Sequence, residues 1–419
     1  MLNRKEQPVL SPIENIDFIE PLIFDITKDV KLFWMKEVPN ETCRIDFYFD
    51  AGNIRSPKGI PSFVNALLLS GTKDKSATQI SNEIDALGGF IDSGISAENA
   101  VFSIYCLKEN LSKLVRFVVD SIDKVAFLEK EVEEMLADKR QAFATNMEKV
   151  SYLCQREFQQ RLFNSSKVYS KVADETYYEN VASQDLKRFF NEFYQNGLTK
   201  VVLVGDVLQD EVDDVIDTVG MWSKDNVATF EKEVNNLPGT IHLDKKGAVQ
   251  TAIRIGRTLF NKKHEDYNDF LVLNTILGDY FGSRLMANIR EDKGYTYGIG
   301  TIVAEYKNIG YFMIATEVGS EVKDATLLEI QKEIDRLKTE LVSEEELSLV
   351  RNYLLGQLLK SADGPYSMTD LFLSAEAQDL DLEFYNKAIH DLNNITAERL
   401  KELAKKYLVW EEMSVVSAG

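Results

Sequence analysis

An internal repeat constrains the fold of this 419-residue chain more than any other feature of its sequence. In the first half, a helix expected to end at Gly88 and Gly89 is followed by two strands and another helix, and the second half shows the same order around Gly294. Gly89 and Gly294 lie 205 positions apart, and the closing strands, which end at Gly205 and Gly419, lie 214 apart. This near-constant offset predicts two copies of one unit rather than a short-period solenoid.

The first copy has clear local signals for strands and helices. Residues 44–50 alternate apolar and polar side chains with a period of two, which is typical of a half-buried strand. Ser76 and Gln79 have the spacing of a capping box, so a helix is expected to begin there. Two strands are expected at 90–96 and 101–107, followed by a helix with one apolar face.

The second copy repeats this order. A strand is expected at 252–256, helices at 269–280 and 285–291, and two strands at 297–303 and 311–317. A further helix with an apolar face follows them. The sequence therefore predicts an α+β fold with two homologous domains. Each domain should have a mainly antiparallel mixed sheet, covered by helices on one side.

The boundary between the domains is expected in a polar stretch rich in turn-forming residues, 224–240. We place an N-terminal domain at 1–225, a linker at 226–240 and a C-terminal domain at 241–419. Two domains of roughly 200 residues agree with the usual size of a folded domain.

Charge and cysteine content exclude several classes of function. The chain has 68 Asp and Glu against 48 Lys and Arg, a net charge of -20. Such a surface repels phosphate backbones and anionic lipid, so neither nucleic acid nor membrane is an expected partner. Cys43, Cys106 and Cys154 form no CxxC pair and are expected to be buried free thiols in a reducing compartment. The N-terminus lacks a signal-peptide pattern and no apolar run approaches the ~20 residues that span a bilayer, so we expect a cytoplasmic location.

Familiar catalytic motifs are largely absent from the sequence. The sequence has no glycine-rich nucleotide loop and no GxSxG elbow. The three histidines, His242, His264 and His390, all lie in the second half, without the spacing of metal ligands. None of them is expected to be a metal ligand.

The order of glycines, apolar residues and turns resembles the insulinase/pitrilysin family of zinc metallopeptidases, whose smaller members are close to the mitochondrial processing peptidases. In the first half, the resemblance rests on Gly59–Ala66, Leu69–Thr72 and Leu87–Gly89. In the second half, Ser283–Leu285 and Ile289–Gly298 are similar to the family signature that runs from SRL to REekGYtY. The resemblance spans nearly the whole chain.

The zinc-binding motif that this resemblance implies is absent. Active members carry H-x-x-E-H on the helix before the Gly71 turn, where two histidines bind the metal and the glutamate activates a water molecule. Alignment on the surrounding glycines places Ser62, Asn65 and Ala66 at these three positions. Neither the two imidazoles nor the general base is therefore present.

The third zinc ligand of the family, a glutamate, is also missing. It would align near Ala142, and no glutamate lies between Glu134 and Glu148. Serine, asparagine and alanine do not replace imidazole on zinc. We therefore expect no cofactor in this chain and no peptidase activity from it alone, with zinc held by a catalytic partner.

The substrate-binding pair implied by the family is retained. In active members, an arginine and a tyrosine seven residues apart reach the zinc site, bind the substrate backbone and stabilise the developing oxyanion. Arg290 and Tyr297 keep that spacing. A guanidinium and a phenol are suitable donors to a carbonyl that gains charge. Without the resemblance, Arg290 would be interpreted as a surface residue at a helix end and Tyr297 as a strand aromatic.

Three hypotheses follow. The first is a non-catalytic subunit of a heterodimeric zinc peptidase, which binds peptides and completes the active site of a homologous partner with intact H-x-x-E-H. A homodimer is the expected alternative for the isolated chain. The second is a peptide-binding or structural scaffold homologue without a role in proteolysis. The third, a self-sufficient peptidase with another metal site, is disfavoured because the first half has no histidine.

Overall fold

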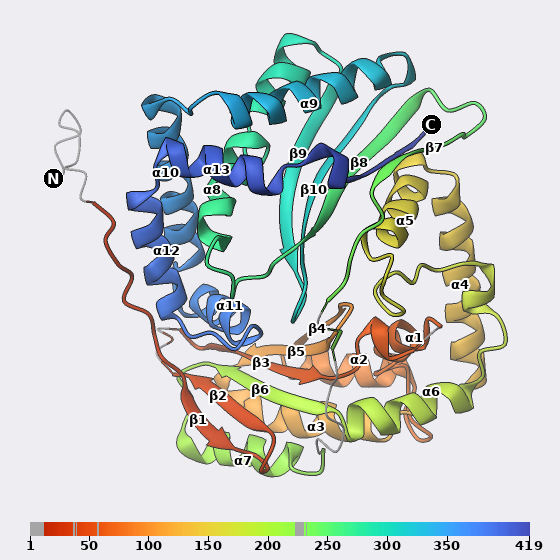
Figure 1. Ribbon diagram of the computed structural model, residues 1–419. Coiled ribbons are helices and arrows are strands. Elements are labelled where there is room, and N and C mark those ends of the chain that lie inside the picture. Colours follow the sequence, from red (N-terminus) through yellow and green to blue (C-terminus); the bar gives the residue numbers. More distant parts are fainter. Residues whose placement is uncertain (1–11, 37, 39, 57, 223–229, 232) are drawn as a thin grey trace, which may run out of the picture.

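The computed structural model describes residues 12–36, 38, 40–56, 58–222, 230–231 and 233–419, and it contains one sheet from each half of the chain (Figure 1). Part of the expected linker lies outside the described residues, so the domain boundaries stay a prediction. The strands of the first sheet are β1 (Leu22–Asp25), β2 (Lys31–Met35), β3 (Thr42–Phe49), β4 (Phe90–Ile95), β5 (Ala100–Leu107) and β6 (Leu198–Val204). Those of the second are β7 (Gly239–Leu243), β8 (Gln250–Leu259), β9 (Thr296–Glu305), β10 (Gly310–Gly319) and β11 (Ser414–Ala418).

The two sheets have the same topology. The strand order is β1-β2-β6-β3-β5-β4 in the first and β7-β11-β8-β10-β9 in the second, so they match strand for strand once β1 is set aside. In each sheet one pair is parallel, β2 with β6 and β7 with β11, and the other pairs are antiparallel. The predicted fold of two mainly antiparallel mixed sheets covered by helices is confirmed.

Helices from each half pack on one face of the sheet formed by that half. The helices over the first sheet are α1 (Ile60–Ala66), α2 (Ala77–Ala86), α3 (Leu111–Asp123), α6 (Ser183–Phe190) and α7 (Gln209–Val219). Those over the second are α8 (Tyr267–Leu277), α9 (Lys323–Thr339), α10 (Glu344–Ser361), α12 (Glu383–Asn394) and α13 (Ala397–Tyr407). None of the helices within the described residues is both long and apolar enough to cross a membrane.

Local signals place several helix ends as expected. The Ser76 hydroxyl accepts a hydrogen bond from the Gln79 N–H, and the Gln79 side chain accepts one from the Ser76 N–H, which completes the capping box of α2. Gly88 follows this helix with a φ of 65°, the left-handed conformation that glycine adopts without steric cost.

The expectation of helices on only one side of each sheet is wrong. α5 (Val150–Leu162), from the first half, packs on β8 and β11 of the second sheet, and Figure 1 shows it beside them. α11 (Pro365–Glu376), from the second half, packs on β6 of the first sheet. α4 (Glu129–Met147) precedes α5 and contacts it. Each half therefore covers the open face of the other half's sheet.

Apolar side chains on both faces of the central strands explain this exchange. In β6, Val201 and Leu203 belong to the core of the first half, whereas Val202 and Val204 belong to a cluster with Phe372 of α11. In the second half, Phe158 of α5 joins a cluster with Ala252 and Val416 on the open face of the sheet. Exposing either face would leave a large apolar surface in water, so the exchanged helices are needed for stability.

The expected α-helix at 285–291 has π-helical geometry over Met286–Asp292, a segment labelled η5. A π-helix places its hydrogen bonds between residues five apart, and short π segments often occur at functional sites. The periodicity of apolar residues in such a short segment does not distinguish the two helix types, which explains the difference from the prediction. Residues 284 and 285 retain α-helical geometry just before this segment.

A buried carboxylate anchors the start of α8. Asp266 is 2% exposed and accepts hydrogen bonds from Arg399, Lys406 and the Tyr407 hydroxyl of α13. Burial alone would raise the pKa of Asp266, but these hydrogen bonds together lower it well below its ordinary value. The carboxylate is therefore ionised at neutral pH and ties α13 to α8.

Replacing Asp266 with asparagine should lower the free energy of unfolding by about 2 kcal/mol at pH 7, because charge-assisted hydrogen bonds to a buried acceptor are lost. The pKa of Asp266 is lower in the folded state than in the unfolded state. The difference in free energy of unfolding between wild type and this variant should therefore be full above about pH 5 and shrink below about pH 4. Urea unfolding from pH 3 to pH 7 measures this, with Asp269→Asn, which loses only a contact to Arg399, as the milder control. A difference that stays constant across this range would contradict the assignment.

Candidate functional site

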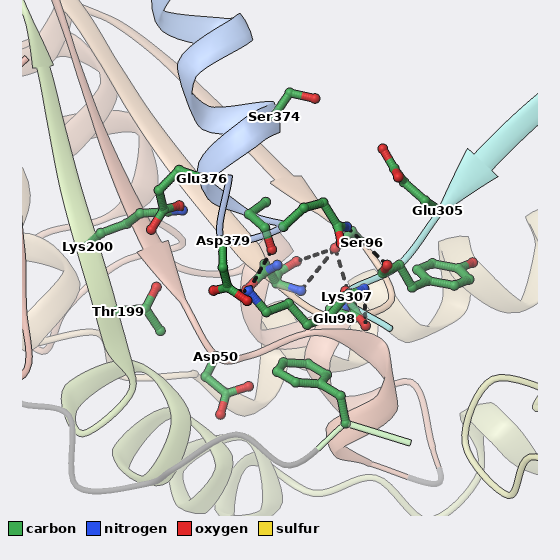
Figure 2. A pocket seen from close by; sticks show the side chains of 15 residues that line it. Asp50, Ser96, Glu98, Thr199, Lys200, Glu305, Lys307, Ser374, Glu376 and Asp379 are labelled. Atoms are coloured by element: carbon green, nitrogen blue, oxygen red, sulfur yellow. Dashed lines mark hydrogen bonds and ion pairs between the residues drawn. The ribbon is translucent and has the colours of Figure 1, made fainter. Parts of the chain in front are cut away.

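The two halves meet around a cavity of about 550 Å³ (Figure 2). The first half contributes the turn between β4 and β5, the residue after β3 and the start of β6. The second half contributes the turn between β9 and β10 and the end of α11. These two turns occupy equivalent positions in the repeat. Among the lining residues are Glu98 and Lys200 from the first half and Lys307, Glu376 and Asp379 from the second.

The charged side chains around this cavity have partners within the protein. Lys200 pairs with Glu376, and Figure 2 shows the two side chains pointing toward one another. Lys307 pairs with Asp379 at 2.6 Å. Because these charged side chains pair with one another, we interpret the cavity as a junction between the two halves rather than as a ligand site.

Glu98 is a buried carboxylate at the junction, with 8% of its surface exposed. Its oxygens accept hydrogen bonds from the Lys307 backbone N–H at 2.9 and 3.1 Å and from the Tyr169 hydroxyl at 2.5 Å. Burial raises its pKa, and these hydrogen bonds oppose the rise. Glu98 thus fixes a turn of the first half against the equivalent turn of the second.

The positions aligned with the zinc motif lie on α1, in the lower part of Figure 1. The Ser62 hydroxyl donates to the Gly59 carbonyl at 2.9 Å, a bond within the first turn of the helix. Ala66 is exposed and carries only a methyl group. Neither side chain offers a donor that zinc prefers over water.

Asn65, at the position of the general base, is part of the core. It is 7% exposed, and its Oδ1 accepts a hydrogen bond from the Tyr194 hydroxyl at 3.1 Å. Tyr194 is 1% exposed, and burial raises the pKa of its phenol, so the hydroxyl keeps its proton. The asparagine therefore satisfies a buried donor and is not available to activate water.

The region expected for the third zinc ligand borders a second cavity of about 820 Å³ between α4, α5 and the turn at Glu175–Tyr178. Phe143 and Ala144 of α4 line it, next to the aligned position Ala142, and Tyr178 links Phe143 to Phe63 of α1 through ring contacts. No group of three His, Cys, Asp or Glu side chains suited to a metal ion occurs anywhere in the part of the chain that the structure describes. The side chains near α1 do not fit a catalytic zinc ion.

Arg290 lies on η5 in the second half, with its guanidinium over the ring of Phe281, 4.7 Å from the ring centroid. Within the described residues, Arg290 makes no hydrogen bond and no ion pair. Its neighbour Arg284 differs, because it binds Glu346 with two hydrogen bonds of 2.8 and 2.9 Å. The donors of Arg290 remain available to an acceptor from outside the chain.

Tyr297 is 92% exposed near the start of β9, which is an edge strand of the second sheet. η5 packs against β9, and the Tyr295 N–H donates to the Ile289 carbonyl at 3.0 Å, which holds the connecting turn. The structure therefore puts Arg290 and Tyr297 on two adjoining elements. α1 packs in the first half and makes its contacts with α6 and β4, so the aligned zinc positions and the pair belong to different halves.

Sequence comparison identifies the family. The model of the insulinase family, peptidase family M16, matches residues 33–175, and the model described as the peptidase M16 inactive domain matches residues 180–354. The chain belongs to the insulinase family. The resemblance expected from its glycines and from the Ser283–Gly298 signature is thereby confirmed.

Relatives and solved structures extend this result to both halves. The uncharacterized zinc protease YmxG of Bacillus subtilis is 22% identical over 83% of this chain and 85% of its own length. The human mitochondrial-processing peptidase subunit beta is 22% identical over 90% of this chain and 80% of its own length. A crystal structure of a peptidase M16 inactive domain from Pseudomonas fluorescens matches with a TM-score of 0.87 at 20% identity, over 95% of this chain and 98% of that one, and shows the same fold.

The role of Asn65 can be tested by its removal. Asn65→Ala should lower the free energy of unfolding by about 2 kcal/mol, because the buried Tyr194 hydroxyl loses its acceptor. Tyr194→Phe should recover about 1 kcal/mol of this loss in the double variant. Urea unfolding measures both values, and Ala66→Ser, on the exposed side of the same helix, should stay within about 0.5 kcal/mol of wild type. Equal effects at positions 65 and 66 would contradict a structural role for Asn65.

Proposed function

We propose that this chain is the non-catalytic subunit of a heterodimeric zinc peptidase and that its substrates are peptides. A homologous partner would bring the H-x-x-E-H helix, the zinc ion and the general base. This chain would bring Arg290 and Tyr297 to the scissile region of the bound peptide. The guanidinium and the phenol would donate hydrogen bonds to the substrate backbone and to the oxygen that gains charge.

The observation that carries this proposal is that the zinc motif is lost while the substrate-binding arginine and tyrosine are retained. Asn65 has become part of the core, whereas Arg290 has no acidic partner among the described residues and Tyr297 is almost fully exposed. In a chain of net charge -20, an arginine without a partner retains its full capacity to bind an acceptor. A purely structural scaffold does not need such a pair.

The purified chain should contain well below one zinc ion per molecule, because α1 offers a hydroxyl, a buried amide and a methyl group in place of the ligands. Inductively coupled plasma mass spectrometry after dialysis measures the zinc content. One zinc ion per molecule that is lost when first-half residues are changed would overturn the proposal that only the partner chain binds zinc.

Mixing this chain with a homologue that has an intact H-x-x-E-H should produce cleavage of a flexible peptide that neither chain cleaves alone. Arg290→Ala should lower kcat/KM by about 100-fold and Tyr297→Phe by about 10-fold, since a donor to the oxyanion is removed. Arg188→Ala, which removes an exposed arginine from α6, is the matched control and should change kcat/KM less than two-fold. Cleavage that is insensitive to both site variants would show that the pair has no catalytic role. Peptide binding without cleavage would favour a scaffold.

Phe281 should help to position Arg290, because its ring lies under the guanidinium although it is itself 63% exposed. Phe281→Leu is expected to lower kcat/KM of the mixed enzyme about three-fold, the size of an exposed cation–π contact, and Phe281→Tyr should restore it. The control Phe90→Leu removes a ring of nearly equal exposure, 64%, from β4. If leucine and tyrosine at position 281 behave alike, the ring does not position Arg290.

A further inference from the structure

Two of the three cysteines, 63 positions apart in sequence, face each other inside the first sheet. Cys43 on β3 and Cys106 on β5 are directly opposed in the antiparallel register, and their Sγ atoms lie 3.5 Å apart. Both are buried, with 1% and 5% of their surfaces exposed. The third cysteine, Cys154 on α5, donates instead to the Val416 carbonyl at 3.4 Å.

The backbone around this pair suits a disulfide. Opposed residues of an antiparallel pair have Cα atoms about 4.5–5.5 Å apart, within the span of about 4.4–6.8 Å that a disulfide bridges. Gly205 provides the space on one side, since a Cβ atom there would lie 2.6 Å from the Cβ atom of Cys43. The Trp34 indole N–H donates to the Gly205 carbonyl at 2.8 Å and fixes that residue.

The pair lies one step from the end of the strand pair. Thr42 and Leu107 form the last rung between β3 and β5; Thr42 is exposed and Leu107 is 41% exposed. Tyr366 and Lys108 donate hydrogen bonds to the Thr42 and Glu41 carbonyls at this end. Strand ends open locally at low free-energy cost, so opening of this rung together with these two bonds gives a small oxidant access to both sulfurs. The hydrogen bond from Cys43 also lowers the pKa of Cys106, which makes Cys106 the attacking thiolate of the two.

We propose that Cys43 and Cys106 are a redox modification site at which an intramolecular disulfide forms with a small-molecule disulfide as oxidant. The Cys106 thiolate attacks one sulfur of oxidised glutathione, and the S–S bond breaks with one glutathione thiolate leaving. Cys43 then loses its proton and attacks the Cys106 sulfur of the mixed disulfide, which releases the second glutathione. The two cysteines lose two electrons, the glutathione disulfide gains them, and the two protons end on the glutathione thiols.

The new bond would close a loop around the helix that carries the lost zinc motif. The segment between Cys43 and Cys106 contains α1, α2 and β4, and therefore Ser62, Asn65 and Ala66. A covalent link restricts the unfolded chain, so the oxidised form should be more stable than the reduced form. Oxidation would thus change the stability of the first half without adding any group to the surface.

The test is incubation of the full-length chain with oxidised glutathione, followed by thiol titration in denaturant and peptide mapping. Titratable thiols should fall from three to one, and a peptide linked through Cys43 and Cys106 should appear and vanish again with dithiothreitol. Cys154→Ser should form the same link, whereas Cys43→Ser and Cys106→Ser should lose it. The midpoint of thermal unfolding should rise on oxidation of wild type and Cys154→Ser only.

Three titratable thiols after incubation, or stable single glutathione adducts at position 43 or 106, would overturn the proposal. A link that involves Cys154 would overturn it as well. Because the main measurement uses the wild-type chain, a serine variant that fails to fold does not remove the test.

Discussion

The packing of the two halves against one another depends on the exchange of α5 and α11 between them. Each sheet has two apolar faces, and the helices of its own half cover only one of them. Val202 and Val204 of β6 need Phe372 from the other half, and Val416 of β11 needs Phe158. Neither half can therefore bury its sheet alone, since the apolar surface left in water would cost several kcal/mol per side. Glu98 adds a second link between the halves, because it accepts hydrogen bonds from the Lys307 N–H, at the equivalent turn of the repeat, and from the Tyr169 hydroxyl.

Local features of this fold could be predicted from the sequence, and features that depend on distant partners could not. The strand expected at 44–50 is β3, and the capping box at Ser76 begins α2, because both are determined by neighbouring residues. The continuous apolar run Val201–Val204 does indicate a strand buried on both faces. It does not reveal that the second face is covered by α11, which lies more than 160 residues further along the chain. The π-helical geometry of η5 cannot be predicted, because the segment is too short for its apolar periodicity to distinguish a π-helix from an α-helix.

The same limit applies to the candidate site. The sequence shows that the zinc ligands are missing, but only the fold shows that Asn65 accepts a hydrogen bond from the buried Tyr194 hydroxyl. An amide in place of a carboxylate at this position suits a neutral partner and avoids an unpaired buried charge. Cys43 and Cys106 gave no signal because their pairing is set by strand register, which depends on the whole sheet. Their wide separation in sequence and the absence of a CxxC pair predict only buried free thiols.

Two arginines of one segment show how the second half divides structural and binding roles. Arg284 is held by two hydrogen bonds to Glu346, so its charge is used to fix the start of α10 against the signature segment. Arg290, six positions later, lies next to Glu291 and Asp292 in sequence and yet makes no ion pair with a described residue. The cation–π contact with Phe281, 4.7 Å from the guanidinium carbon to the ring centroid, positions the group without forming a hydrogen bond. An arginine arranged in this way is fixed in position and still able to form all of its hydrogen bonds with a ligand, and this arrangement is what a site completed by a second chain requires.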